Sequence, residues 1–205
     1  MLYYEKQAKK KGYKFIIGVD EVGRGTLAGP VVASAVILKS YKFNNTIRDS
    51  KKMTSFQRER AFNEILKKAY IGIGVMNETV IDYFNILNAT KFAMEQSISH
   101  LQVRCKNRPM NRDKTIVLVD GNVQLDIDFR YKNIINGDSR SLSVACASIV
   151  AKVIRDRMML IYSKVYPNYK FDTHKGYGTK RHIAFINQFG PCPIHRKTFA
   201  PLRLN

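Results

Sequence analysis

Two adjacent acids follow an apolar run near the start of the chain. Asp20 and Glu21 come directly after Ile16–Val19, and the glycine-bracketed Arg24 lies just beyond them. Acids at the end of a buried strand cost free energy unless a lysine, an arginine or a divalent metal neutralises them. A turn accounts for one acid here, because Asp is an ordinary turn residue, but it does not account for two. The pair therefore marks a candidate cation site.

Two further acids stand in comparable places. Asp120 ends the apolar run Thr115–Val119, and Asp138 lies in a Gly-Asp-Ser turn before a long helical pattern. Taken singly, each suits a turn or a helix cap. Taken together, they are expected to meet, because strand ends of one sheet converge on one edge. Asp156, between two arginines, could add a ligand, but a helix-surface ion pair explains it better.

Carboxylates gathered in this way suit hard metal ions. Mg²⁺ and Mn²⁺ prefer carboxylate oxygens and keep water ligands for a substrate. Two such ions about 3.5–4 Å apart can clamp the attacking and leaving oxygens of a phosphodiester displacement. The chemistry predicted for the four acids is therefore metal-dependent cleavage of a nucleic acid.

The composition supports a polyanionic partner. Lysine and arginine number 35 against 16 acids, so the formal net charge is +19. Such a field attracts nucleic acid or an acidic membrane surface. The sequence has no apolar run of about 18 residues and no secretory h-region, so we expect no membrane association and a cytoplasmic protein. The three scattered cysteines show no zinc spacing and are expected to be packing residues in a reducing compartment.

The elements that must position the acids follow from hydrophobic periodicity. A capping-box pattern, Thr54 with Gln57, opens one helix. Helical spacing also covers 86–101, 141–162 and 180–188, and the first 13 residues form a lysine-rich lead-in. Strands are predicted at Lys14–Val19, Val31–Leu38, Tyr70–Met76 and Thr115–Val119, with a short one near Ile134. The order predicts an α/β fold, a mixed sheet covered by helices, in a single domain over 1–205 whose basic C-terminal extension begins near 165.

The glycine loop after the first strand has two interpretations. Gly23, Gly25 and Ala28 complete the spacing G-x-G-x-x-A of a dinucleotide site, but that motif must open a helix. Gly29-Pro30 and a β-branched run follow instead, so we reject it. Two glycines around Arg24 would let the backbone approach a ligand closely, although a tight turn with a solvated arginine is an equal alternative.

With these features in place, the chain resembles the ribonuclease HII family. The resemblance rests on ordered motifs that span residues 14 to 201: Gly18–Gly25 with Ala28–Val32, Asp49–Met53, Val119–Asn122, Gly137-Asp138 with Ser141–Ser143, Ala147–Ile149, Ala151–Val153, Arg155–Arg157, His174–Thr179, and Gly190-Pro191 with Pro193–Arg196. It implies a ribonuclease H-like fold, with a mixed five-stranded sheet flanked by helices and a helical C-terminal extension. It also implies that Asp20, Glu21, Asp120 and Asp138 bind two Mn²⁺ or Mg²⁺ ions during catalysis.

The resemblance further implies the substrate and the residues that read it. The family cleaves on the 5′ side of a ribonucleotide in RNA–DNA hybrids or in duplex DNA, and leaves 3′-hydroxyl and 5′-phosphate ends. Its ribose-reading positions fall on Gly23, Arg24, Gly25 and Tyr177. Asn136, Ser139 and Arg140 depart from residues that are common in the family near the last acid, which affects phosphate contacts there and not the metal ligands.

Basic side chains of two segments are expected to hold the duplex. Arg48, Lys51 and Lys52 follow the second strand, and Lys175, Lys180, Arg181, Arg196 and Lys197 lie in the C-terminal segment. His174, His182 and His195 are assigned to hydrogen-bond networks and not to catalysis. The leading hypothesis is a monomeric endoribonuclease that removes ribonucleotides from DNA in replication and repair. The alternative is a non-catalytic basic nucleic-acid-binding protein, which explains the charge but not the four acids.

Overall fold

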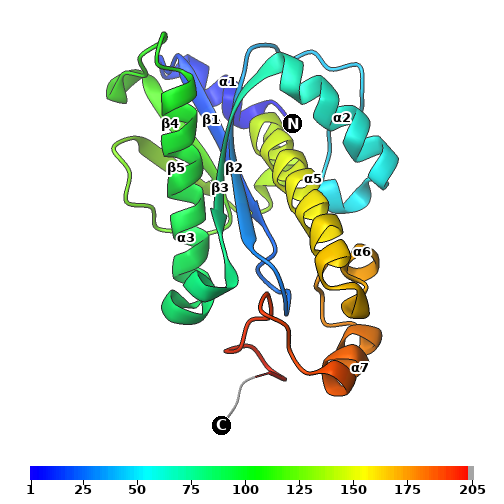
Figure 1. Cartoon of the computed structure of the whole chain (residues 1–205). Helices are drawn as coiled ribbons and strands as arrows, with labels where there is room; N and C mark the ends of the chain where they lie inside the picture. Colours follow the sequence, from blue (N-terminus) through cyan, green and yellow to red (C-terminus); the bar gives the residue numbers. More distant parts are fainter. Residues whose placement is uncertain (203–205) are drawn as a thin grey trace.

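A mixed five-stranded sheet forms the centre of the molecule. In the computed structural model, which describes residues 1–202, the strand order is β3-β2-β1-β4-β5 (Figure 1). Here β1 is Phe15–Val22, β2 Val31–Leu38, β3 Ala69–Met76, β4 Thr115–Asp120 and β5 Arg130–Ile134. β1 pairs antiparallel with β2 and parallel with β4, while β2–β3 is antiparallel and β4–β5 parallel. The predicted α/β class and five-stranded mixed sheet are confirmed.

Helices cover both faces of this sheet. The long helix α3 (Glu78–Arg104) lies on one face, and α2 (Ser55–Lys68) and α5 (Leu142–Val165) lie on the other (Figure 1). One apolar core lies between the sheet and α3, and a second lies beneath α2 and α5. The glycines of β3 allow the approach of α3, because a Cβ at Gly72 or Gly74 would collide with its backbone. This is the close packing that those glycines predict.

The ends of the helices follow local chemistry. Thr54 and Gln57 form the predicted capping box at the start of α2. α3 starts earlier than predicted, because Asn77 caps a first segment that breaks at Asn85 (φ 65°) before the helix resumes. The predicted start at Ile86 is the start of the second segment. The lysine-rich lead-in forms the helix α1 (Tyr3–Lys10), which packs beside the sheet.

Short elements complete the chain. They are the one-turn helices α4 (Gly137–Arg140) and α6 (Phe171–His174), the helix α7 (Lys180–Phe189), and the 3₁₀ turns Ser50–Lys52, Arg112–Lys114 and Pro167–Tyr169. The C-terminal segment has its own apolar cluster, to which Leu27 and Ala28 of the β1–β2 loop contribute. Figure 1 shows this segment below the sheet, next to that loop. None of the helices described is long and apolar enough to cross a membrane.

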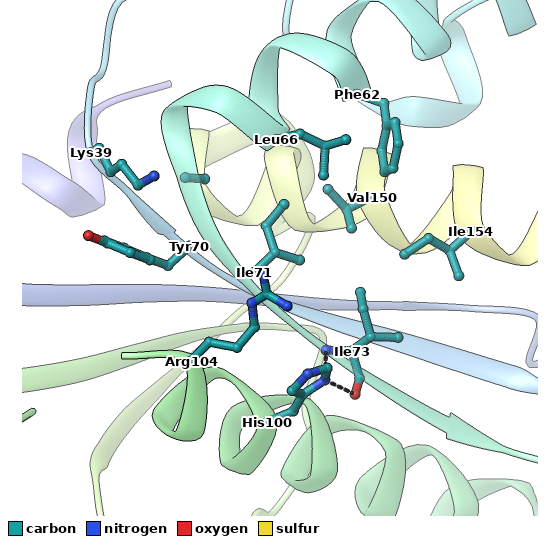
Figure 2. Close-up of a pocket in the computed structure, with 11 residues that line it drawn as sticks. Lys39, Phe62, Leu66, Tyr70, Ile71, Ile73, His100, Arg104, Val150 and Ile154 are labelled. Carbon is teal, nitrogen blue, oxygen red and sulfur yellow. Dashed lines mark hydrogen bonds between the residues drawn. The ribbon is translucent and has the colours of Figure 1, made fainter. Parts of the chain in front are cut away.

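Side chains of α3 protect the exposed edge of the sheet. The ring Nδ1 of His100 lies 3.2 Å from both the N–H nitrogen and the carbonyl oxygen of Ile73 (Figure 2). The Oε1 of Gln96 accepts a hydrogen bond of 2.7 Å from the Val75 N–H. An edge strand with free N–H and C=O groups invites pairing with another chain, so these contacts limit that tendency. The groove drawn in Figure 2 contains none of the four predicted acids.

Candidate active site

The first acidic pair lies inside a strand and not after it. β1 continues to Val22 and stays paired with β2 through Glu21↔Ala33, so the predicted end at Val19 is wrong. Pairing with β4, in contrast, stops at Val19↔Val119. Asp20 and Asp120 therefore follow the last shared rung of two parallel strands, which in sheets lie about 4.8 Å apart. The strands separate where the acids begin.

Each member of the pair has its own environment. Asp20 is buried, with 4% of its surface exposed, and its Oδ1 accepts a hydrogen bond of 2.7 Å from the Glu21 N–H. Glu21 is half-buried, and its Oε1 lies 3.3 Å from Nη1 of Arg24. Neighbouring strand residues face opposite ways, so the two carboxylates approach the site from different sides of β1.

A hydrogen bond links the third acid to the residue that precedes the fourth. The Gly137 N–H donates to Oδ1 of Asp120 over 2.6 Å. Gly137 opens the one-turn helix α4, and Asn136 before it adopts a left-handed conformation (φ 55°) that turns the chain toward β4. The next residue is Asp138, which is 8% exposed. The bond thus places Asp138 next to the end of β4.

Three of the four acids have a raised pKa. Burial raises the pKa of Asp20 well above its ordinary value, and the charges on Glu21 and Asp120 raise it further. Burial also raises the pKa of Glu21, although Arg24 opposes it. The pKa of Asp138 is raised by burial and by Asp49 and Asp120. Repulsion between these carboxylates therefore contributes to the raised pKa values, and a bound cation would reduce that repulsion.

The loop after β2 supplies a cation and a further acid. Burial lowers the pKa of Lys51, but the nearby carboxylates, led by Asp20 and Asp138, outweigh this and leave it raised. Ser50 anchors the loop to α5 through a hydroxyl contact of 2.9 Å with Ser148. Asp49 lies close enough to Asp138 to affect its pKa. The sequence alone does not indicate this, because an Asp before a short turn is usually a cap, and Asp49 does cap the turn that follows it.

The carboxylates suit a hard cation, but they do not form a complete metal-binding site by themselves. Within residues 1–202 no three His, Cys, Asp or Glu side chains form a ready-made metal-binding group. One oxygen of Asp120 is already used by Gly137. Carboxylate oxygens are nevertheless the ligands that Mg²⁺ and Mn²⁺ prefer, and burial together with neighbouring carboxylates disfavours ionised Asp20 and Asp138 when no cation is bound.

The two glycines of the loop after β1 have different surroundings. Gly23 has a φ of 95°, and a Cβ there would collide with the Arg155 side chain. Gly25 has no heavy atom within 4 Å of the corresponding position and is exposed. Gly23 is therefore required because no side chain fits between the loop and Arg155. Gly25 instead leaves open space on the solvent side of the loop.

The predicted tyrosine lies beside this loop. Tyr177 is bridged to Thr26 in the manner of two antiparallel strands, and the residue is 41% exposed. Lys175, two residues earlier, is half-buried, and its carbonyl accepts a hydrogen bond of 2.9 Å from Arg155. The structure thus brings the glycine loop and the tyrosine loop together, as a shared role predicts.

The remaining basic residues divide into two groups. Arg48 and Lys52 are exposed, as are Lys180, Arg181 and Lys197, so they are available to phosphates. The prediction that Arg196 contacts the duplex is wrong, because its side chain is fully buried and bonds to backbone carbonyls of the glycine loop. Arg155 is buried in the same way. No local signal in the sequence distinguishes these two arginines from surface ones.

The other polar residues behave as predicted. Asp156 pairs with Lys152 over 2.8 Å on the surface of α5. The ring Nε2 atoms of His182 and His195 lie 3.0 Å apart, and His174 stacks on His182. All three histidines are buried in a hydrogen-bond network beneath the tyrosine loop. The three cysteines are free and buried.

Comparisons with known proteins indicate the family and the fold. The family model described as ribonuclease HII matches residues 17–202. A ribonuclease HII of Acetivibrio thermocellus is 48% identical over 200 residues, which are 97% of this chain and 75% of that protein. Ribonuclease H2 from Pyrococcus horikoshii superposes with a TM-score of 0.70 at 24% identity, over 92% of this chain and 95% of that one. Bst-RNase HIII in complex with Mn²⁺ gives 0.71 at 16% identity, over 95% and 70%.

Proposed function

The chain belongs to the ribonuclease HII family and is a ribonuclease H hydrolase, and from this premise we propose which bond it cuts. We propose that it hydrolyses the phosphodiester on the 5′ side of a ribonucleotide, both in RNA–DNA hybrids and at single ribonucleotides in duplex DNA. The products carry 3′-hydroxyl and 5′-phosphate ends. The observation that carries the proposal is the position of Asp20 and Asp120 at the point where β1 and β4 separate, next to the glycine loop.

Four carboxylates are proposed to hold two divalent ions, Mn²⁺ or Mg²⁺. They are Asp20, Glu21, Asp120 and Asp138. When bound, such ions lower the pKa of the attacking water and stabilise the departing 3′-oxygen. Manganese is present in the Bst-RNase HIII complex, a structural neighbour. The protein's own part is to fix the carboxylates: Gly137 holds one oxygen of Asp120, and burial keeps Asp20 in a site of low polarity where charge attraction is strong.

The loops beside the acids are proposed to recognise the ribose. RNA differs from DNA at a given position by its 2′-hydroxyl. Arg24 and Gly25 present exposed backbone beside the buried Gly23, and the ring of Tyr177 next to the loop offers a face for a sugar. Arg48, Lys51, Lys52 and Lys175 are proposed to bind the phosphates on either side. The charges on Asp20, Asp138 and Asp120 all raise the pKa of Lys51, which supports a position close to the acids.

The biological setting forms part of the proposal. We propose that the protein is a cytoplasmic monomer that does not associate with membranes. It acts on DNA during replication and repair. We treat 1–205 as one catalytic domain, with a basic C-terminal extension from about 165. The net charge of +19 supports a nucleic-acid partner.

One experiment tests the activity directly. The protein is incubated with a labelled DNA duplex that contains one ribonucleotide, with Mg²⁺, with Mn²⁺ and with a chelator, beside an all-DNA duplex and an RNA–DNA hybrid. We expect metal-dependent cleavage of the first and third substrates only. The fragment on the 5′ side should serve as a polymerase primer without phosphatase treatment. Binding without cleavage in either metal would instead support the non-catalytic alternative, and a cut on the 3′ side would refute the assigned position.

A further inference from the structure

Two fully buried arginines lie behind the glycine loop, and neither forms a salt bridge with a carboxylate of residues 1–202. Arg155 and Arg196 each have 0% of their surface exposed. Burial lowers the pKa of Arg196 to about 9, and the charge of Arg155 contributes to the shift. A buried cation without a counter-ion is expensive, so its hydrogen bonds must be good. All those found within residues 1–202 go to neutral oxygens of the glycine loop and of Lys175.

Arg196 binds two consecutive carbonyls of the loop. Its Nη2 donates to the Gly23 oxygen over 2.6 Å, and its Nη1 donates to the Arg24 oxygen over 2.8 Å. A trans peptide is planar, and its C=O and N–H point in opposite directions. Holding these two carbonyls inward therefore turns the N–H groups of Arg24 and Gly25 outward.

Those two N–H groups are available to a ligand. In the described part of the chain, neither the Arg24 N–H nor the Gly25 N–H donates a hydrogen bond to another protein group. Both residues are exposed, and the space over Gly25 is open. A hydrogen bond from a charged donor to a carbonyl also polarises the peptide and strengthens its N–H as a donor. The pair is thus aimed at an acceptor atom outside the protein.

Arg155 offers an internal contrast at two of the three peptides whose carbonyls it binds. Its guanidinium donates to the carbonyls of Ala28, Pro30 and Lys175. The N–H groups that share a peptide with the Ala28 and Lys175 carbonyls are already used, since Gly29 donates to Ile194 over 2.8 Å and Gly176 donates to His174 over 3.2 Å. The two arginines are similar in burial, but Arg196 binds the two loop peptides whose N–H groups face outward.

We propose that Arg196 is a positioning residue for ribose recognition: it aims and polarises the backbone N–H groups of Arg24 and Gly25 toward an acceptor oxygen at the 2′ position. The inference rests on the proposed function, because it assigns the acceptor to a ribonucleotide. Arg155 fixes the other end of the loop and joins it to the tyrosine loop, and serves as a structural support. Arg196 itself does not touch the substrate, since it is buried.

The test compares Arg196→Lys with Arg155→Lys. A lysine keeps the positive charge but cannot bridge two carbonyls with a rigid fork. The quantity measured is the ratio of dissociation constants for an all-DNA duplex and for the same duplex with one ribonucleotide, with Ca²⁺ in place of the catalytic metal. For Arg196→Lys we expect this preference to fall roughly tenfold, about the worth of one to two hydrogen bonds. Arg155→Lys should lose stability to a similar degree but keep the preference.

Controls separate this inference from the proposed function. Arg112→Lys, at an exposed ion pair with Asp128, should leave folding, binding and cleavage unchanged. If the wild-type protein does not cleave ribonucleotide-containing duplex at all, the proposed function fails. If the wild-type cleaves and Arg196→Lys keeps the full preference while folded, this inference alone is wrong. If both buried variants lose the preference equally, Arg196 has only a structural role and the inference is also wrong.

A measurement on the wild-type protein covers the case in which the variants do not fold. The amide signals of Arg24 and Gly25 are followed by ¹⁵N–¹H NMR during titration with each duplex. A new hydrogen bond moves an amide proton downfield, so we expect both signals to move further with the ribonucleotide than with DNA alone. Equal shifts with the two duplexes would overturn the proposal.

Discussion

Gly23 and Gly25 have the same side chain but different reasons to be glycine. Gly23 combines a left-handed φ with contact to Arg155, whereas a Cβ at Gly25 would have no heavy atom of residues 1–202 within 4 Å. We expect Gly23→Ala to lower the free energy of unfolding by about 2–5 kcal/mol, from backbone strain and overpacking. Gly25→Ala should change it by less than about 1 kcal/mol and instead weaken ribonucleotide cleavage. Urea denaturation and cleavage assays on both variants check this, and equal stabilities would contradict it.

Asp20 is a residue whose charge opposes folding. Because its pKa is raised in the folded state, ionisation at neutral pH costs stability. We expect Asp20→Asn to raise the melting temperature, by roughly 2–4 °C for each kcal/mol recovered. Cleavage should fall by roughly a thousandfold, since several kcal/mol of metal-dependent stabilisation is lost. Duplex binding should persist.

A metal titration supplies the control for this variant. Mg²⁺ or Mn²⁺ should raise the melting temperature of the wild-type protein, because an ion that binds only the folded state stabilises it. The same ions should have little effect on Asp20→Asn or Asp120→Asn. A variant that still cleaves at the wild-type rate would remove the acids from the mechanism.

At the scale of elements, α1 is attached to the start of α5 by a buried carboxylate. Glu5 is 1% exposed, and its Oε1 accepts hydrogen bonds from the Ser141 hydroxyl, the Ser143 hydroxyl and the Ser143 N–H at 2.6–2.9 Å. A negative charge at a helix N-terminus is also favourable. Because α5 begins just after α4, this attachment supports the segment that carries Asp138.

Removing this carboxylate should therefore loosen the link between α1 and α5. We expect Glu5→Ala to reduce the free energy of unfolding by about 2–4 kcal/mol, since hydrogen bonds to a charged group are lost. Lys6→Ala, at the exposed neighbouring position, should have an effect of less than about 0.5 kcal/mol. Chemical denaturation measures both, and similar small effects would show that α1 is dispensable for the fold.

The C-terminal element depends on neutral histidines. Burial lowers the pKa of His182 to about 4 and that of His195 to about 4. The unfolded chain has the ordinary value of about 6.5, so between pH 6.5 and 4 it binds more protons than the folded chain. The free energy of unfolding is therefore highest above pH 6.5 and decreases as the pH falls from 6.5 to 4.

The expected loss is up to about 1.4 kcal/mol per pH unit for each histidine. Melting temperatures between pH 7.5 and 4.5 measure it. His182→Gln should flatten the curve, because it removes one of the two histidines whose pKa is lowered to about 4. A wild-type melting temperature that does not depend on pH in this range would contradict the prediction.

At the scale of the whole molecule, a large net positive charge accompanies a cluster of acids. With a net charge of +19, duplex binding should release counterions from the phosphates. We expect the logarithm of the binding constant to fall linearly with the logarithm of salt concentration, with a slope of about −0.9 for each phosphate contacted. Ribonucleotide-containing and all-DNA duplexes should share this slope, because phosphates carry no sequence information. Different slopes would indicate that the ribose changes the number of phosphate contacts.

The sequence by itself determined the class of fold and the identity of the chemical groups. Alternation and helical spacing are local properties, so the strands of the sheet and the helices α2, α5 and α7 could be predicted within a few residues. The capping box of α2 is equally local, because its partners lie three residues apart. The ordered motifs indicated the family, which the family model confirms.

Only the tertiary structure decided how β1 ends and what the buried arginines do. β1 continues past Asp20 because β2 pairs with it up to Val22, a partner that its own residues do not reveal. Arg196 resembles a surface cation in the sequence, yet it is buried because distant carbonyls of the glycine loop supply its hydrogen bonds. The positions of Asp49 and Asp138 likewise depend on loops that meet in space. Strand pairing and burial depend on contacts between segments that are far apart in the sequence, so local patterns do not predict them.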